Sequence, residues 1–177
     1  MSRLASSRTH IALIGLPGSG KTTIGLSIAQ ALEAPFIDID QEIERTHQKS
    51  IRDIFAESGE QMFRELEAHM SRQIAQTSDW SVVATGGGWA INKEAVAHLR
   101  SISRIIYLRV SPAEALRRMD SGISARPLLS GPTASERLHT LYEARKWFYE
   151  EIADLEVDTE AFGQDQLVTT IVRHFSE

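Results

Sequence analysis

Gly15-Leu16-Pro17-Gly18-Ser19-Gly20-Lys21-Thr22 is the stretch from which the fold of this chain can be worked out. It has the form G-x-x-x-x-G-K-T, the pattern of a loop that wraps around phosphate groups. An apolar run at 10–14 precedes it, as expected for a strand buried on both faces of a parallel sheet. After it, apolar residues recur at helical spacing as far as 33. Because this motif binds phosphates between a strand and a helix, we predict a nucleoside triphosphate site here.

The residue types in this loop suit a phosphate ligand. Glycines at 15, 18 and 20 let the backbone bend so that N–H groups point inward, and the following helix adds its positive N-terminal end. Lys21 can reach the outer phosphates, and Thr22 offers a hydroxyl to Mg²⁺. The alternative is a chance match or a glycine-rich turn without a ligand, which the flanking pattern disfavours.

The composition is that of an ordinary globular domain. Hydrophobic residues make up 42% of the 177 and charged residues 24%, and the net charge of −5 gives no basic excess for nucleic acid. The absence of cysteine excludes disulfides, thiolate metal sites and a cysteine nucleophile. The chain shows neither an apolar signal core nor a run long enough to span a bilayer. We therefore expect a cytoplasmic protein with a flexible tail at 1–8, a single domain at 9–177, and no nucleic acid or membrane partner. We also expect a monomer, although nothing in the composition determines the oligomeric state.

Hydrophobic periodicity and turn residues predict alternating strands and helices. Strands are expected at 10–14, 36–39, 80–85, 104–110 and 153–157. Helices are expected from the loop to 33, at 41–46, 50–57, 60–76, 92–100 and 111–119, from 133 onward and at 165–175, with a break at Ser58-Gly59. Ser111-Pro112 and Thr133 with Glu136 are typical helix starts, the second a capping box.

Asp38 and Asp40 lie at the end of the second predicted strand, where alternation places both on one face. Ligands of doubly wound sheets bind beyond the carboxyl ends of the strands, so the pair favours a functional role. In the alternative, Asp40 caps the helix from Gln41 and Asp38 pairs with a basic side chain. No acid follows the next two predicted strands, which leaves Asp38 as the nearest candidate to hold Mg²⁺ through water.

Gly86-Gly87-Gly88 follows the third predicted strand directly. Three ordered glycines lose much chain entropy, so a loop that keeps them favours close approach of backbone or ligand over a plain flexible turn.

Three arginines are candidates for binding anions. Arg126 lies in the Ser-, Gly- and Pro-rich stretch 120–132, which is either a hinged lid or an ordinary connection. Arg145 falls on the apolar stripe of the helix after 133, where an anionic ligand is favoured over a snorkelling side chain or an internal ion pair. Arg64 follows Glu60 by four residues, and spacing alone favours a surface ion pair.

These pieces occur together, in this order, in one known family: from residue 11 to 159 the chain resembles shikimate kinase. The matching segments are the phosphate loop, Phe36-Ile37-Asp38-Ile39-Asp40, Ile54-Phe55…Gly59-Glu60…Phe63-Arg64…Glu67, Gly86-Gly87-Gly88, Arg126-Pro127-Leu128-Leu129, Arg145…Tyr149 and Val157-Asp158-Thr159. The loop alone is generic, whereas the ordered set is specific to the family.

The resemblance implies an α/β fold of the P-loop nucleoside monophosphate kinase type. That fold has three layers: a five-stranded parallel sheet of order 2-3-1-4-5 with helices on both faces, substrate-binding helices at about 40–76 and a mobile lid at about 120–132. The implied reaction moves the γ-phosphoryl group of ATP to the 3-hydroxyl of shikimate, a step toward aromatic amino acids.

The resemblance also implies roles for individual residues. ATP would be bound by Gly18, Ser19, Gly20, Lys21, Thr22, Thr23, Arg118 and Arg126, with Arg118 stacked on adenine. Shikimate would be bound by Asp40, Arg64, Gly86, Gly87, Gly88 and Arg145, the two arginines clamping its carboxylate. Mg²⁺ would be held at Thr22 and Asp38. Lys21, Asp40 and Arg126 would be catalytic, Asp40 as the base and Arg126 as the lid cation. Arg64, which spacing alone assigns to the surface, is thereby reassigned to the site.

Two residues depart from the family pattern: Trp147 stands where Pro is expected, and Trp89 follows the glycines where a smaller aliphatic residue is common. The alternatives are another small-molecule kinase of this fold, acting on gluconate or a nucleoside monophosphate, and a non-catalytic nucleotide-binding regulator. A switch GTPase is disfavoured because the chain has no N-K-x-D signal.

Overall fold

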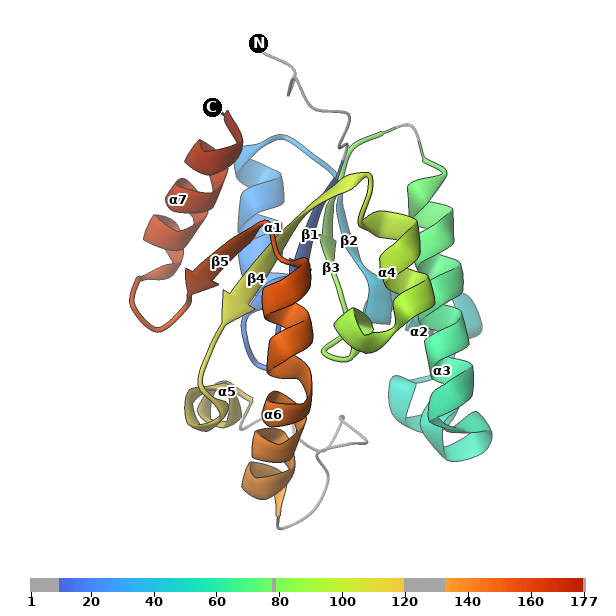
Figure 1. Cartoon of the computed structure of the whole chain (residues 1–177). Helices are drawn as coiled ribbons and strands as arrows, with labels where there is room; N and C mark the ends of the chain where they lie inside the picture. Colours follow the sequence, from blue (N-terminus) through green and yellow to red (C-terminus); the bar gives the residue numbers. More distant parts are fainter. Residues whose placement is uncertain (1–9, 78, 120–132, 177) are drawn as a thin grey trace.

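Five parallel strands form a single sheet in the computed structural model, which describes residues 10–77, 79–119 and 133–176 (Figure 1). The strands are β1 (His10–Ile14), β2 (Phe36–Asp38), β3 (Val82–Ala84), β4 (Ser103–Arg109) and β5 (Leu155–Asp158). Their order is β2-β3-β1-β4-β5, which confirms the expected topology. In this register Leu13 of β1 lies between Ala84 of β3 and Ile106 of β4. All five residues of β1 are therefore buried, and each fully buried Leu or Ile side chain contributes about 1.5–3 kcal/mol.

Helices cover both faces of the sheet. They are α1 (Lys21–Ala31), α2 (Ile39–His47), α3 (Ile51–Ala75), α4 (Lys93–Leu99), α5 (Pro112–Arg118), α6 (Ala134–Ile152) and α7 (Gln164–Ser176), with the 3₁₀ turn η1 (Trp89–Ile91) before α4. One face carries α1 and α7, whose apolar residues pack with Leu13 and Ile106. The other carries α2, α3, α4 and α6, which pack around Trp89 and Tyr149. The chain thus has the three layers expected.

Several element boundaries depart from the sequence expectations. The second strand ends at Asp38, and the next helix begins at Ile39 rather than Gln41. The helices expected at 50–57 and 60–76 run together as α3 across a kink at Gly59, whose φ of 80° suits only glycine well. The strand expected at 80–85 is shorter, and the fifth runs to Asp158.

The two predicted helix starts have different outcomes. Ser111 accepts a hydrogen bond from the Glu114 amide, as expected of an N-cap, which stabilises α5 by about 1 kcal/mol. Thr133 precedes α6, but its side chain makes no capping hydrogen bond, so the capping box is wrong. At Thr133 the backbone has φ −100° and ψ 26°, not the extended conformation that directs a capping hydroxyl at the first amides.

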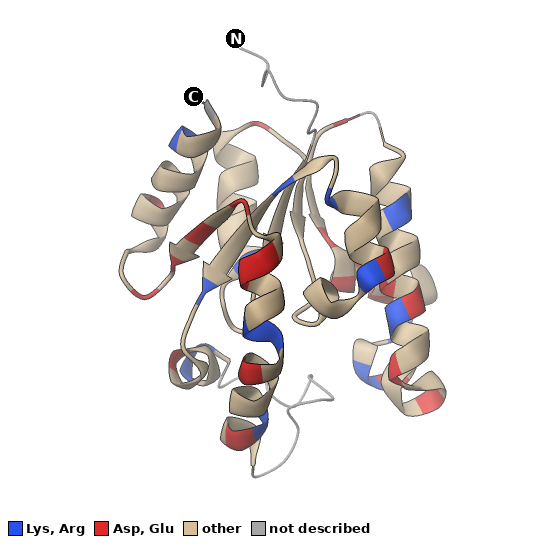
Figure 2. Ribbon diagram, in the orientation of Figure 1, with Lys and Arg blue, Asp and Glu red and all other residues tan. Residues whose placement is uncertain are grey.

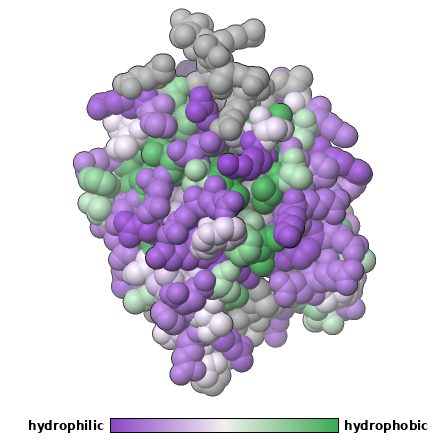
Figure 3. Space-filling model, in the orientation of Figure 1, coloured by the Kyte–Doolittle hydropathy of each residue, from purple (hydrophilic) through white to green (hydrophobic). Residues whose placement is uncertain are grey.

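The face of the molecule shown in Figure 3 is largely hydrophilic. No helix in the described part of the chain has the length and apolar character needed to cross a membrane. The expected tail at 1–8 and the expected lid at 120–132, with Arg126, lie outside the described residues.

Candidate active site

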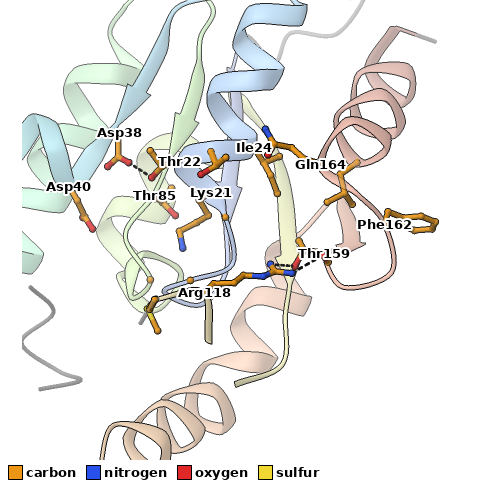
Figure 4. Close-up of a pocket in the computed structure, with 16 residues that line it drawn as sticks. Lys21, Thr22, Ile24, Asp38, Asp40, Thr85, Arg118, Thr159, Phe162 and Gln164 are labelled. Carbon is orange, nitrogen blue, oxygen red and sulfur yellow. Dashed lines mark hydrogen bonds between the residues drawn. The ribbon is translucent and has the colours of Figure 1, made fainter. Parts of the chain in front are cut away.

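A cavity of about 590 Å³ opens at the carboxyl ends of the strands, beside the phosphate loop (residues 15–22) (Figure 4). Of the sequence-predicted residues, it is lined by Gly18, Gly20, Lys21, Thr22, Thr23, Asp38, Asp40, Gly87 and Arg118. Ser19 is fully buried within the loop and does not line the cavity. The other lining residues are Ile24, Thr85, Met119, Thr159, Phe162, Gln164 and Leu167. The cavity thus extends well beyond the loop that defines it.

The phosphate loop is shaped by backbone conformations that favour glycine. Gly18 has a φ of 83°, and a Cβ atom there would lie 3.0 Å from Cγ of Met119. A side chain at 18 would therefore be strained and would press on α5. Nζ of Lys21 donates to the carbonyl oxygens of Gly15 and Leu16 at 2.9 and 2.8 Å, which holds the ammonium group against the loop.

Thr22 and Asp38 are joined directly. The Thr22 hydroxyl donates to Oδ2 of Asp38 at 2.7 Å, and Oδ1 of Asp38 accepts from the amide of Gln41. Asp38, rather than Asp40, is therefore the N-cap of α2. The alternative in which Asp40 caps this helix is wrong. A hydroxyl and a carboxylate held together at the phosphate loop are the hard oxygen donors that Mg²⁺ takes beside phosphates and water. These residues fit a magnesium ion.

Arg118 reaches the cavity from α5. Its guanidinium donates to the hydroxyl and carbonyl oxygens of Thr159 at 2.9 and 3.0 Å, and its Nε donates to Glu114 at 2.8 Å. The Thr159 hydroxyl in turn donates to the carbonyl of Arg109. The guanidinium is thereby fixed in the cavity wall at the end away from Asp40 (Figure 4).

The glycine loop (residues 86–88) is the point where three helices meet. A Cβ at Gly86 would lie 2.9 Å from Oδ1 of Asp40 on α2. A Cβ at Gly88 would lie 2.6 Å from Nη1 of Arg64 on α3. Since such approaches leave no space for a side chain, the expectation of close packing is confirmed, and the flexible-turn alternative is wrong.

Arg145 and Tyr149 approach the same loop from α6. Both donate to the carbonyl oxygen of Gly87, Arg145 through Nη1 at 3.1 Å. Arg145 is 4% exposed, so it does not snorkel, and it takes part in none of the ion pairs found among the described residues. Burial raises the pKa of Tyr149 to about 12, although Arg145 acts in the opposite direction, so the hydroxyl remains a donor at neutral pH.

Glu67 is a site residue to which no role was assigned from the sequence. It is fully buried and pairs with Nη1 of Arg64 at 2.6 Å, while Glu60 pairs with Nη2 at 2.7 Å. Figure 2 shows acidic and basic positions side by side along α3. Burial raises the pKa of Glu67, and the charges of Arg64 and Arg145 both oppose that rise. The charges of Arg64 and Arg145 thus both stabilise the ionised form of one buried carboxylate. The spacing R-x-x-E places Arg64 and Glu67 on one helix face, and this spacing is the sequence signal that could have identified Glu67.

The two tryptophans that depart from the family pattern lie outside the cavity wall. Trp89 is fully buried, and its indole N–H donates to the Ser71 hydroxyl at 3.0 Å. Trp147 is 61% exposed on α6. Neither substitution therefore adds a side chain to the walls of this cavity.

Comparison with known proteins agrees with this geometry. Residues 17–176 match the model of the family described as shikimate kinase. The chain is 35% identical over 167 residues to the shikimate kinase of Enterococcus faecalis, covering 94% of this chain and 98% of that one. It is 41% identical over 147 residues to the shikimate kinase of Mycobacterium tuberculosis, with 83% and 82% covered. The structure resembles shikimate kinase from Acinetobacter baumannii in complex with shikimate, with a TM-score of 0.88, 30% identity, and 94% and 92% covered. The chain therefore belongs to the shikimate kinase family.

Proposed function

We propose that this chain transfers the γ-phosphoryl group of ATP to the 3-hydroxyl of shikimate where the cavity meets the glycine loop. One observation carries the proposal: Asp40 lines the cavity that starts at the phosphate loop and also lies against Gly86, while the next two residues of the glycine loop contact Arg145 and Arg64. A carboxylate in this place can accept a hydrogen bond from a hydroxyl group that lies next to the terminal phosphate.

The phosphate loop would hold the nucleotide. Its backbone N–H groups and the N-terminus of α1 favour phosphate oxygens, and Lys21 would exchange its bonds to loop carbonyls for bonds to the outer phosphates. Thr22 and Asp38 would hold Mg²⁺, which when bound neutralises phosphate charge. Arg118 at the far end would meet the adenine base with its flat guanidinium.

Arg64 and Arg145 would bind the carboxylate of the acid. Each presents a guanidinium that fits a carboxylate through paired hydrogen bonds. Both lie near the glycine loop, whose residues carry no side chain of their own, so that its backbone would contact the ring. Two charged groups at one end and Asp40 at the other would orient the acid with a hydroxyl toward the phosphate.

Asp40 would accept the proton of the attacking hydroxyl. Phosphoryl transfer depends mainly on positioning and charge neutralisation, so the chain needs no covalent intermediate. Lys21 supplies positive charge from the described residues. Arg126 would supply more from the segment 120–132, as the family resemblance implies.

A coupled assay of ADP release tests the proposal directly. Shikimate, gluconate and nucleoside monophosphates would be compared as acceptors with MgATP. We expect turnover with shikimate to exceed that with the others by orders of magnitude, because the alternatives lack a ring acid for the two arginines. Preferred turnover of gluconate or a nucleoside monophosphate would replace this function with another kinase activity, and no turnover of any acceptor would favour a regulator.

A further inference from the structure

The end of the cavity away from Asp40 is built to hold a flat group. Phe162, 45% exposed, and the buried Leu167 line the cavity together with Arg118. Figure 4 shows Phe162 and Arg118 on the side away from Asp40, with Phe162 farther out. Aromatic, aliphatic and guanidinium surfaces can all pack on the face of a nucleotide base. Packing against the face of a base does not distinguish one purine from another, because every base has such a face.

One neutral polar side chain in this end of the cavity, Gln164, has an orientation fixed by its neighbours. Gln164 is the first residue of α7, and its Nε2 donates to the hydroxyl oxygen of Ser27 on α1 at 2.9 Å. The Ser27 hydroxyl in turn donates to the carbonyl oxygen of Thr23 at 3.2 Å. A short relay of hydrogen bonds therefore runs from the backbone of α1 to the amide of Gln164.

This relay determines which end of the amide faces the ligand. A serine hydroxyl has one proton, and the Thr23 carbonyl can only accept, so the proton is committed to that bond. Ser27 can then only accept from Gln164, which places the NH₂ group of the amide toward Ser27. The carbonyl oxygen Oε1 is left as the acceptor, and no hydrogen bond to it is found within the described part of the chain.

We propose that Gln164 selects adenine over 6-oxo purines, with Ser27 as the residue that positions it. Oε1 accepts a hydrogen bond from the 6-amino group of adenine. Guanine and hypoxanthine carry a carbonyl oxygen at that position, so two acceptors would face each other without a proton between them. The inference rests on the proposed function, because it needs the nucleotide in this cavity with its base at the Phe162 end.

Binding of MgADP and MgIDP to the full chain, measured by isothermal titration calorimetry, tests this without relying on turnover. The two ligands differ at the 6-position and the adjoining ring nitrogen. We expect the unmodified chain to bind ADP more tightly and Gln164→Leu to reduce the ADP:IDP affinity ratio about tenfold, the worth of one hydrogen bond of this kind. Ser27→Ala should reduce the ratio by a smaller factor, because the amide can then turn. Gln164→Glu, which keeps an acceptor, should preserve the preference for ADP.

Gln166→Leu is the matched control, since Gln166 is an exposed glutamine of the same helix that does not line the cavity. An ADP:IDP ratio that is the same in Gln164→Leu and Gln166→Leu would overturn the inference. Failure to bind ADP at all would overturn both the inference and the placement of ATP. A shifted ratio in a chain that does not phosphorylate shikimate would support the inference while refuting the proposed function.

Discussion

Nη1 of Arg145 donates a hydrogen bond to the carbonyl oxygen of Gly87 at 3.1 Å, which joins α6 to the loop after β3. The sequence separation of 58 residues means that this contact exists only in the folded chain. It holds a buried guanidinium behind Gly87, which itself lines the cavity, and under the proposed function this is where the acid group of shikimate would bind.

Arg145→Ala should raise KM for shikimate about 10- to 100-fold with a smaller effect on kcat, because it removes charged hydrogen bonds to the acid group. Steady-state kinetics at saturating ATP measure both constants. Lys146→Ala, which removes a partly exposed cation of the same helix, should leave both unchanged. Equal KM values in the two variants would show that Arg145 is only structural.

Asp40→Asn should leave ATP binding nearly intact while turnover falls by about 10² or more, the range for a lost general base. Asp79→Asn, in an exposed turn far along the chain, is a control for the loss of one negative charge. Calorimetric titration of ATP and rapid-quench turnover with shikimate separate the two effects. Near-normal turnover would contradict the role of Asp40 as base.

Gly88→Ala should weaken shikimate binding and also lower the free energy of unfolding, because an Arg64 side chain that moves away leaves the buried Glu67 without its ion-pair partner. The added Cβ would meet the end of the flexible Arg64 side chain, which can move but would then leave its position beside the glycine loop. Gly163→Ala adds the same group where no atom lies within 4 Å. We expect KM for shikimate to rise severalfold and the thermal unfolding temperature to fall in the first variant alone. An unchanged KM would show that Arg64 does not bind the acid group.

Asp38→Asn should raise the Mg²⁺ concentration needed for half-maximal turnover, since it removes a charge from the Thr22–Asp38 pair. Asparagine keeps an oxygen that can accept from the Gln41 amide, so the cap of α2 survives. Turnover measured against Mg²⁺ at fixed ATP is the test. A superimposable Mg²⁺ curve would show that Asp38 acts only as a cap.

His10 should make the fold less stable in mild acid. It is 2% exposed on β1, its Nδ1 lies 2.9 Å from the Ser81 hydroxyl, and burial lowers its pKa. The unfolded chain takes up a proton near pH 6.5 while the folded chain resists it, so falling pH favours unfolding below that point. For one proton, the free energy of unfolding falls by at most about 1.4 kcal/mol for each pH unit.

Urea unfolding at pH 7.5 and 5.5 measures this loss. The stability difference between the two pH values should shrink in His10→Asn compared with the unmodified chain. A difference of the same size in both proteins would assign the acid sensitivity to other groups.

The approximate positions of the strands and helices followed from local signals in the sequence, whereas the layers and the strand order were implied by the family resemblance. The phosphate loop identifies the first strand and helix, and Ser111-Pro112 marks the start of α5 at the position observed. Thr133 and Glu136 match the same kind of pattern, yet Thr133 makes no capping bond. A capping motif specifies residue types, whereas the bond depends on the backbone angles that the preceding segment imposes.

The site was predictable in part. Spacing showed that Arg145 would be buried, but the partner on Gly87 lies far along the chain and depends on how α6 meets the glycine loop. Spacing also assigned Arg64 to a surface pair with Glu60; that pair exists, but Glu67 draws the same guanidinium inward to 17% exposure. Local rules recognise neighbours on a helix and carry no information on which of them the sheet will cover.

The glycine loop also bears on resistance to inhibitors. A compound that contacts only its peptide groups touches atoms that every amino acid shares, so a point substitution can alter that surface only by adding a Cβ. A Cβ atom at Gly86 would press on Asp40 and Glu67, and one at Gly88 would press on Arg64. Asp40 and Arg64 take part in the proposed reaction, and Glu67 holds Arg64 in position. Escape from such a compound by mutation of this loop would therefore impair the enzyme as well.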